Sequence, residues 1–442
     1  MSRSLLAAVS NSVRNLRYSY LFLPALVALA FAGLGVVMAV VDGLVAERLT
    51  RLAFPGGPSA ARSLLATIAT SAATVAGVSF SITVVTLQLV SQQFSPRALR
   101  TFLGDRLNQI VAGIFIGVFL YCLVLMRSIR DDGEFAAGIS VLLAIVLAFV
   151  ALAALLVFIN HMGHAIQVSE ISDRIAYATL QSIERLFPEE YGDPVASDDA
   201  DEVVAAWRRD GEPTLVYPRR PGFVQAVDDI PSTIEGRSFR IEILVSPGDF
   251  VTERHPLAAV WTDADAEACS VALRRAVAVS NERDLHQDTA YGVRQLADIA
   301  VKALSPSVND PTTATTCVGY LQGILERLAE RRWPADVRRF EDRDVTIVFR
   351  APAFREYVEA LVQIGRYAED ARVVHSLVAA CQRIAEAAAE ANAPDRVAAV
   401  VDAAERIVAR ADALDETERA QIEELVRALP RPQQRGRSGR AA

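Results

Sequence analysis

Cysteine is scarce in this sequence, and its spacing excludes two kinds of site. The four cysteines stand singly at Cys122, Cys269, Cys317 and Cys381, and no two of them form a CxxC pair. A disulfide framework or a zinc site needs paired spacings, so neither is expected. His161 and His164, one turn apart, could share a metal ion or sense pH. A polar helix end explains them as well, and we predict no metal and no cofactor.

Basic charge is also in short supply. Lysine and arginine together number 45 against 53 aspartates and glutamates, for a net charge of −8, and Lys302 is the single lysine. Nucleic-acid binding needs a concentrated basic face, so no nucleic-acid partner is expected. Only the low-complexity end is basic, and residues 430–442 are predicted to form a disordered tail.

Motifs of established enzymes are missing. The sequence has no GxxxxGK[ST] loop, no GxSxG elbow and no HExxH helix. No residue is therefore predicted to be catalytic, and the chain is not expected to be an enzyme. A membrane enzyme that uses Lys302, Asp298 and Asp310 remains a third hypothesis, which predicts a closed pocket around these groups.

Charge is absent from four apolar segments near the N-terminus. Residues 18–41, 64–93, 108–126 and 137–160 contain no Asp, Glu, Lys or Arg. A helix needs about 20 such residues to cross a bilayer, so we predict a transmembrane domain at 1–163 with four spans. The absence of ionisable groups at membrane depth argues against a coupled transporter. A modest arginine bias predicts an inner-membrane protein with both termini in the cytoplasm.

The second segment, residues 64–93, differs from the other three because it is rich in hydroxyls and amides. At 100° per residue, seven of these side chains fall within a sector about 100° wide. They are Thr67, Thr70, Ser71, Thr74, Ser81, Gln88 and Gln92. This stripe either lines a water-filled pore or packs against neighbouring helices. Ser79, Thr83 and Thr86 fall on another face and are predicted to pack between helices.

The sequence that follows the four apolar segments predicts a soluble α+β part after the all-α membrane region. Residues 164–212 are predicted as a connecting helix and acidic linker, 213–262 as a small β-rich domain and 263–429 as a helical cytoplasmic domain. The β-rich pattern GFVQAVD, RIEILVSPGDFV and HPLAAVW resembles half of a lipoyl or biotinyl-type barrel. That segment has no lysine to carry a cofactor, so a swinging arm is excluded.

Helical periodicity follows to the end of the ordered sequence. Helices are expected at 264–283, 288–304, 311–332, 353–368, 370–391, 395–412 and 415–428, with one strand at 344–349. Pro311 after Asp310 is typical of a helix start, with Asp310 as the cap.

The densest polar stretch is residues 281–314. Arg294, Asp298 and Lys302 follow one another at i,i+4 spacing on one helix face. One interpretation is a small anionic-ligand or phosphate site at a helix N-terminus, and the other is a structural ion-pair network or subunit contact. The residues concerned are Asp288, Arg294, Asp298, Lys302, Asn309, Asp310, Thr312 and Thr313.

Three blocks in order carry a resemblance that covers nearly the whole chain. They are SFSITVVTLQLVSQQFSPRAL at 79–99, the GFVQ, PGDFV and PL elements, and DLHQDTAYGVRQLADIAVKALSPSVNDPTTA. The chain resembles a bacterial family of predicted membrane proteins of unknown function. The resemblance implies N-terminal spans and a C-terminal soluble domain, and no activity. Pro221 before Gly222 departs from the small hydroxyl residue expected there.

These observations favour a homo-oligomeric ion channel lined by the second segment and regulated by the cytoplasmic domain. Four helices with one polar face are too few to enclose a pore alone, so the partners expected are the lipid bilayer and further copies of the chain. The alternative is a non-conducting membrane scaffold or signalling protein whose soluble domain binds partners or a small anionic ligand.

Overall fold

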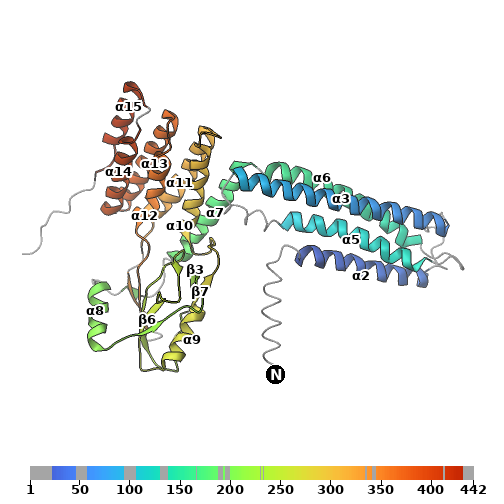
Figure 1. Ribbon diagram of the computed structural model, residues 1–442, viewed down its shortest axis with the longest axis horizontal. Coiled ribbons are helices and arrows are strands. Elements are labelled where there is room, and N and C mark those ends of the chain that lie inside the picture. Colours follow the sequence, from blue (N-terminus) through green and yellow to red (C-terminus); the bar gives the residue numbers. More distant parts are fainter. Residues whose placement is uncertain are drawn as a thin grey trace, which may run out of the picture. The chain divides into compact units, whose positions relative to one another are not determined.

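The computed structural model divides the chain into two compact units, Met1–Ile171 and Ser172–Ala442 (Figure 1). We call them the membrane unit and the soluble unit. The structure describes residues 22–45, 57–93, 106–129, 138–165, 167–187, 193–194, 200–228, 230–231, 233–333, 336–340, 345–411 and 414–431. Residues 18–21 of the first expected span and residues 432–442 of the expected tail lie outside this description.

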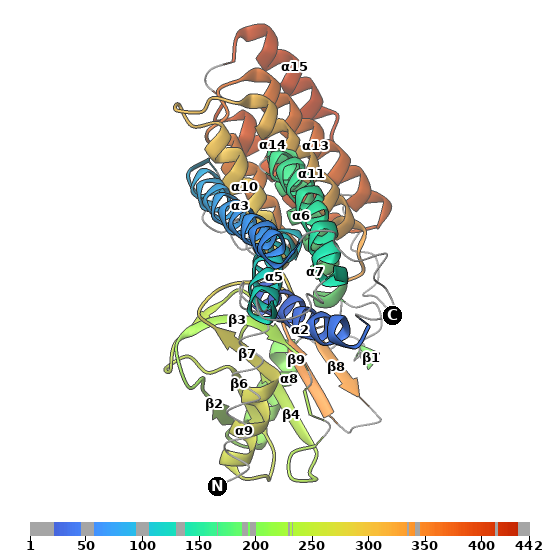
Figure 2. The same ribbon diagram turned by 90° about the vertical axis from the view of Figure 1, so that its right-hand side faces the viewer.

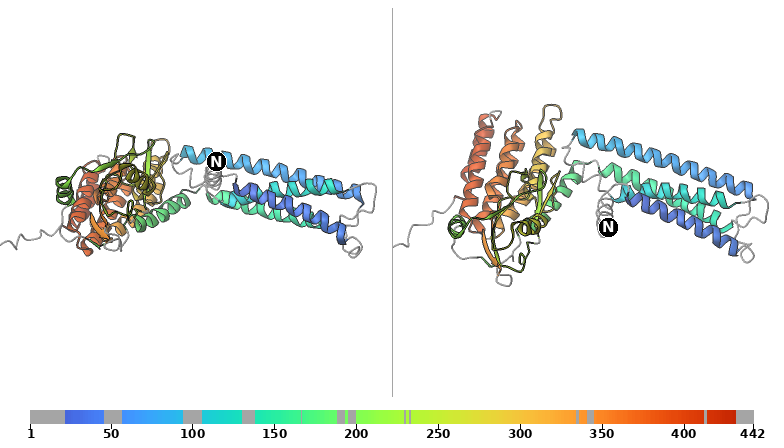
Figure 3. Two further views of the ribbon diagram at one scale, coloured as in Figure 1. Left: turned by 90° about the horizontal axis from the view of Figure 1, so that it is seen from below. Right: turned by 60° about the horizontal axis from the view of Figure 1, so that its bottom comes forward.

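The described part of the membrane unit contains four long apolar helices, α2 (Phe22–Val45), α3 (Pro58–Gln93), α5 (Arg106–Ser128) and α6 (Gly138–Ala165). All four are long and apolar enough to cross a bilayer, which confirms the four apolar helices predicted from the sequence. They lie side by side in both views of Figure 3. The outward residues of α2 and α6 are large and apolar, such as Leu29, Phe149 and Leu156, as a lipid-facing surface requires.

Small residues bring α2 and α5 into close contact. Gly113 lies against Val27, whose Cβ is 2.8 Å from the position a side chain at Gly113 would take. One turn later a Cβ at Gly117 would lie 2.8 Å from Cγ of Phe31. This GxxxG spacing on α5 lets the two backbones approach, as is common between membrane helices.

A buried carboxylate ties the end of α2 to the start of α6. Asp42 is 4% exposed and accepts hydrogen bonds from the amides of Ile139 (3.2 Å) and Ser140 (3.3 Å) and from the Ser140 hydroxyl. It thereby satisfies N–H groups that the first turn of a helix leaves open. Helix α2 continues beyond residue 41, the predicted end of the first span, and its last turn includes the charged residue Asp42.

Helix α7 (Val168–Leu186) begins in the last residues of the membrane unit, and the rest of it belongs to the soluble unit. The described residues that follow contain two β-sheets. The strands are β1 (Asp193–Pro194), β2 (Thr214–Val216), β3 (Gly222–Val227), β4 (Phe239–Ile243), β5 (Phe250–Val251), β6 (Ala258–Trp261), β7 (Val277–Ser280), β8 (Val337–Phe340) and β9 (Val345–Phe349). Six form a sheet in the order β1-β8-β9-β4-β6-β2, and three form a second sheet in the order β5-β3-β7. Figure 2 shows both sheets in the lower part of the soluble unit.

The expected lipoyl-type barrel at 213–262 is not confirmed, because neither sheet closes among the described residues. The strands of this segment separate into the two sheets and take partners from outside it. β3 pairs with β7, and β4 pairs in parallel with β9, so that Ile241 lies opposite Ile347. Alternating apolar residues identify a strand but not its partner, and β9 lies about a hundred residues further along the chain.

The six-stranded sheet has one face in the core and one face partly under a helix. Phe239, Ile241 and Ile243 of β4 point into a core that includes α9 (Ala266–Ala276). On the other face α8 (Ala200–Asp210) packs Val204 and Trp207 against β6, β8 and β9. This alternation is the ordinary period of a strand.

Six helices complete the described part of the soluble unit, α10 (Thr289–Ala303), α11 (Pro311–Glu330), α12 (Phe354–Gly365), α13 (Ala371–Glu390), α14 (Pro394–Val408) and α15 (Glu416–Arg427). Their positions match the helices predicted from periodicity. The helix expected at 264–283 is too long, because α9 ends at Ala276 and Val277–Ser280 forms β7. The apolar run VAV continues the helical pattern in sequence, but β-branched residues also suit a strand.

Candidate functional site

The polar stripe of α3 faces away from the other helices of its unit. Thr67, Thr70, Ser71, Thr74, Ser81 and Gln88 are exposed. The side chain of Gln92 lies outside the described residues. On the opposite side of the helix Leu65, Ala69 and Ala72 are buried, and so are Ser79, Thr83 and Thr86. The polar residues expected to pack between helices are therefore buried, and the stripe is not part of that contact.

Two hydroxyls of the stripe are oriented by their own helix. Thr67 donates to the carbonyl of Ser63, and Thr74 donates to the carbonyl of Thr70, each at 2.8 Å. A hydroxyl whose proton is used in this way presents only oxygen lone pairs to its surroundings. At these two positions the exposed face of α3 therefore offers hydrogen-bond acceptors.

The cysteines and histidines form no metal centre within the described ranges, where no group of three or more His, Cys, Asp or Glu side chains comes together. All four cysteines are free and buried. In the soluble unit burial raises the pKa of Cys317 to about 11 and that of Cys381 to about 12. His161 is half-buried, and the side chain of His164 lies outside the described residues.

Asp288 is the best-buried acidic residue of the 281–314 block. Its side chain is 1% exposed and receives two bonds from the Arg283 guanidinium, at 2.7 and 2.9 Å. It also caps α10 by accepting the amide of Tyr291 at 2.9 Å. Burial raises the pKa of Asp288, against the opposite effect of Arg283. The ion pair is thus held at a cost in desolvation.

The PGD turn of the β-rich segment closes over this ion pair. Gly248 has φ +97°, and a Cβ there would lie 2.6 Å from both the Arg283 guanidinium and the Asp288 carboxylate. Only glycine fits both the backbone angle and the space. Two blocks that the sequence shows as separate motifs, PGDFV and NERDLHQD, therefore meet at one buried contact.

The other end of the block is capped and exposed. Asp310 accepts the amide of Thr313 at 3.1 Å and its hydroxyl at 2.6 Å, and these bonds lower the pKa of Asp310. The N-terminus of α11 thus already carries a carboxylate, which competes with any anion there. Arg294, Lys302, Asn309 and Thr312 are exposed, while Asp298 is half-buried. The described residues do not enclose Lys302, so the geometry gives the enzyme hypothesis no support.

Helix α10 of this block packs tightly on α7. Thr289 and Ser182 are both fully buried and share a hydrogen bond of 2.9 Å. A Cβ at Gly292 would lie 2.8 Å from Cβ of Thr179. These contacts favour the structural interpretation of the block, because its small and hydroxyl residues pack α10 against α7.

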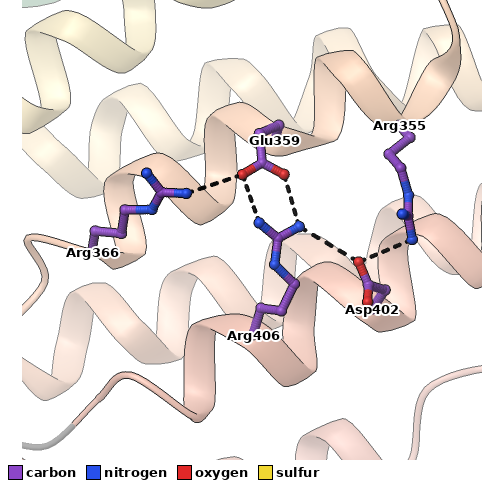
Figure 4. Close-up of polar contacts among 5 residues, drawn as sticks. All are labelled: Arg355, Glu359, Arg366, Asp402 and Arg406. Atoms are coloured by element: carbon purple, nitrogen blue, oxygen red, sulfur yellow. Dashed lines mark hydrogen bonds and ion pairs between the residues drawn. The ribbon is translucent and has the colours of Figure 1, made fainter.

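An ion-pair network that the sequence reading missed joins α12 and α14 (Figure 4). Arg406 binds Glu359 with two bonds of 2.7 and 2.8 Å, and Arg366 approaches the same carboxylate at 3.4 Å. Asp402 pairs with Arg355 at 3.1 Å and with Arg406 at 3.5 Å. The i,i+4 spacing of Asp402 and Arg406 is visible in the sequence, but the pairing across helices is not.

Comparison with known proteins places this architecture in a family. The model of the predicted membrane protein family DUF2254 matches residues 17–383. Uncharacterized proteins of Mycobacterium bovis and Mycobacterium tuberculosis are 34% identical over 411 residues, which cover 88% of this chain and 76% of theirs. No solved structure matches the chain. With four apolar helices followed by a mixed helical and sheet soluble part, the chain belongs to the predicted membrane protein family DUF2254.

Proposed function

We propose that the chain forms a homo-oligomeric pore in the inner membrane, lined by α3 and regulated by the soluble unit. The observation that carries the proposal is the exposed polar stripe on α3. Hydroxyls and amides that lack a hydrogen-bond partner are unfavourable against lipid. The stripe lies opposite the face that α3 packs inside its own unit, so its natural partner is water or a second copy of the chain.

The chemistry of the stripe favours cations. Thr67 and Thr74 direct their protons to backbone carbonyls and leave oxygen acceptors outward. Oxygen acceptors along a lumen replace part of a cation's hydration shell. The described stripe adds no full charge that would hold an ion too tightly to conduct.

Oligomerisation is required by geometry, because a single exposed helix face cannot enclose water. A ring of identical subunits, each contributing α3, would close the lumen. The cytoplasmic location of both termini follows in this proposal from the arginine bias of the loops.

Current through the purified full-length chain in planar bilayers tests the proposal. We would place one cysteine at Thr74 on the stripe, and in a matched control one at Leu152, an exposed apolar residue of α6. A positively charged thiol reagent should block the current of Thr74→Cys and leave that of Leu152→Cys unchanged. The native cysteines are buried and serve as the unreactive background.

The absence of any current carried by cations or anions would contradict the pore proposal. Equal block of the Thr74→Cys and Leu152→Cys currents would contradict it as well. Silence together with a monomeric state would favour the alternative, a non-conducting scaffold whose soluble unit binds partners or a small anionic ligand.

A further inference from the structure

A hollow on the six-stranded sheet marks a site outside the membrane unit. It has a volume of about 580 Å³ and lies on the sheet face that α8 covers only in part, beside the C-terminal end of that helix. Small-molecule sites are typically a few hundred to about a thousand cubic ångströms. The size therefore suits a metabolite rather than a macromolecule.

Strand register builds the floor of this hollow. Arg339 of β8 lies opposite Thr346 of β9, Thr346 lies opposite Arg240 of β4, and Arg240 lies opposite Trp261 of β6. Residues directly opposite each other project from the same face of a sheet. Adjacent strands are about 4.8 Å apart, so the two arginines start roughly 10 Å from each other with a threonine between them.

The aromatic residue on the floor of the hollow, Trp261, already has a hydrogen-bond partner. Trp261 donates its indole N–H to the carbonyl of Gly211 at 3.0 Å. Trp207 of α8 lies edge-on to Trp261, with ring centroids 5.3 Å apart. The Arg240 guanidinium lies 5.7 Å from the Trp207 ring centroid, which orients this cation beside the hollow.

Both signs of charge line the hollow. Arg240 and Arg339 supply two guanidinium groups, and Asp210, Glu212 and Asp263 supply three carboxylates. Arg240 pairs with Asp210 at 2.9 Å, and their side chains are 38% and 63% exposed. Such a pair contributes only about 0–1 kcal/mol, so a ligand group can replace either partner at little cost.

We propose that this hollow binds a small zwitterionic ligand of the amino-acid type. Its carboxylate would lie between Arg240 and Arg339, where the planar guanidinium fork matches it. Its ammonium group would meet the carboxylates of the rim. A simple anion suits the lining less well, because carboxylates outnumber guanidiniums. The site does not depend on the pore, so binding and conduction can fail independently.

The test uses the purified full-length chain in detergent. Thermal unfolding is followed with each of the common amino acids, with inorganic phosphate as a purely anionic probe and with putrescine as a purely cationic one. Calorimetry then gives the affinity for the best probe. The expected result is saturable binding of one or a few amino acids and none of phosphate or putrescine.

Arginine variants locate the binding. Arg240→Ala and Arg339→Ala should each weaken it by at least about tenfold, as the loss of a charge-assisted hydrogen bond implies. Arg275→Ala is the matched control, because Arg275 is an exposed arginine of α9, the helix packed in the core on the other sheet face. It should leave the affinity unchanged. Unfolding without ligand shows that each variant is folded.

Three outcomes would overturn the proposal. The first is that no amino acid binds, the second is that phosphate or putrescine binds as well as any amino acid, and the third is that folded Arg240→Ala and Arg339→Ala variants keep full affinity.

Discussion

At the residue scale, Asp288 is a buried charge whose ionisation works against folding. Its raised pKa means that the folded state binds the carboxyl proton more tightly than the unfolded chain does. The stability that this group contributes is present below the ordinary aspartate pKa of about 4 and is lost as pH rises through the folded-state value.

Asp288→Asn is therefore expected to change how stability depends on pH. Asparagine retains an oxygen that can accept the Tyr291 amide, but it does not titrate. As pH rises from about 4 toward 8, the free energy of unfolding of the variant should improve relative to the wild type. Urea unfolding at a series of pH values measures this difference. A difference that moves in the opposite direction would show that Arg283 outweighs burial.

Glu359 illustrates the opposite case. The hydrogen bonds from Arg406 lower its pKa, so its contribution is present above the ordinary glutamate pKa and is lost as pH falls through the folded value. Its side chain is 41% exposed, and Glu359→Gln should cost only about 0.5–1 kcal/mol at neutral pH. This loss in the free energy of unfolding should be smaller at acid pH.

A matched control for Glu359 is the more exposed pair of Glu423 and Arg427 on α15. Glu423→Gln should cost less, because this pair has one contact at 3.1 Å and no second bond. Chemical unfolding of both variants at neutral and acid pH compares them. An equal cost for the two substitutions would mean that the network across α12 and α14 adds nothing to a simple surface pair.

At the element scale, close helix packing depends on where a glycine lies. Gly117 of α5 contacts Phe31, whereas Gly33 of α2 has open space within 4 Å of where its Cβ would be. Gly117→Val should destabilise the membrane unit by about 1–3 kcal/mol through overpacking. Gly33→Val should have little effect, and Phe31→Ala should partly rescue Gly117→Val.

Thermal stability of the detergent-solubilised chain provides the measurement for these glycine variants. Equal loss at Gly33 and Gly117 would contradict the close approach of α2 and α5. It would indicate that valine disturbs either helix through its own backbone preference rather than through contact.

Elements were predictable where local chemistry determines them. The apolar lengths of the spans, the cap at Asp310 and the proline at Pro311 are local signals, and the structure has helices at these places. Strand partners were not predictable, because β4 pairs with β9 across the chain and no local pattern encodes that choice. The helix ending at Ala276 was misjudged because the apolar sequence continues through β7.

The features of the candidate sites likewise divide into those that one segment of sequence predicts and those that depend on contacts between segments. The stripe of α3 follows from helix geometry alone, and the six of its side chains that the structure describes are exposed. The cap that Asp42 forms on α6 depends on two helix ends meeting in space. The row of Arg339, Thr346 and Arg240 depends on register between three strands, so neither feature could be read from one segment.

At the scale of the whole molecule, α7 is where the two units divide, and most of it belongs to the soluble unit. The boundary falls between Ile171 and Ser172, inside the helix. Ile175 and Ile183 are fully buried, and Arg331 donates two hydrogen bonds to the carbonyl of Phe187, at 2.6 and 2.8 Å. A segment that the sequence suggests is a connector is thus packed as part of a core.

Truncation distinguishes a packed α7 from a connector. A chain of residues 167–442 should fold as a soluble protein with one cooperative thermal transition, because it retains the buried side of α7. A chain of residues 193–442 lacks the contacts of Ile175 and Ile183, each worth about 1.5–3 kcal/mol when buried. Domains have about 5–15 kcal/mol in total, so the shorter chain should melt at lower temperature or aggregate. Circular dichroism and size-exclusion chromatography of the two chains compare them, and equal stability would show that α7 merely connects the units.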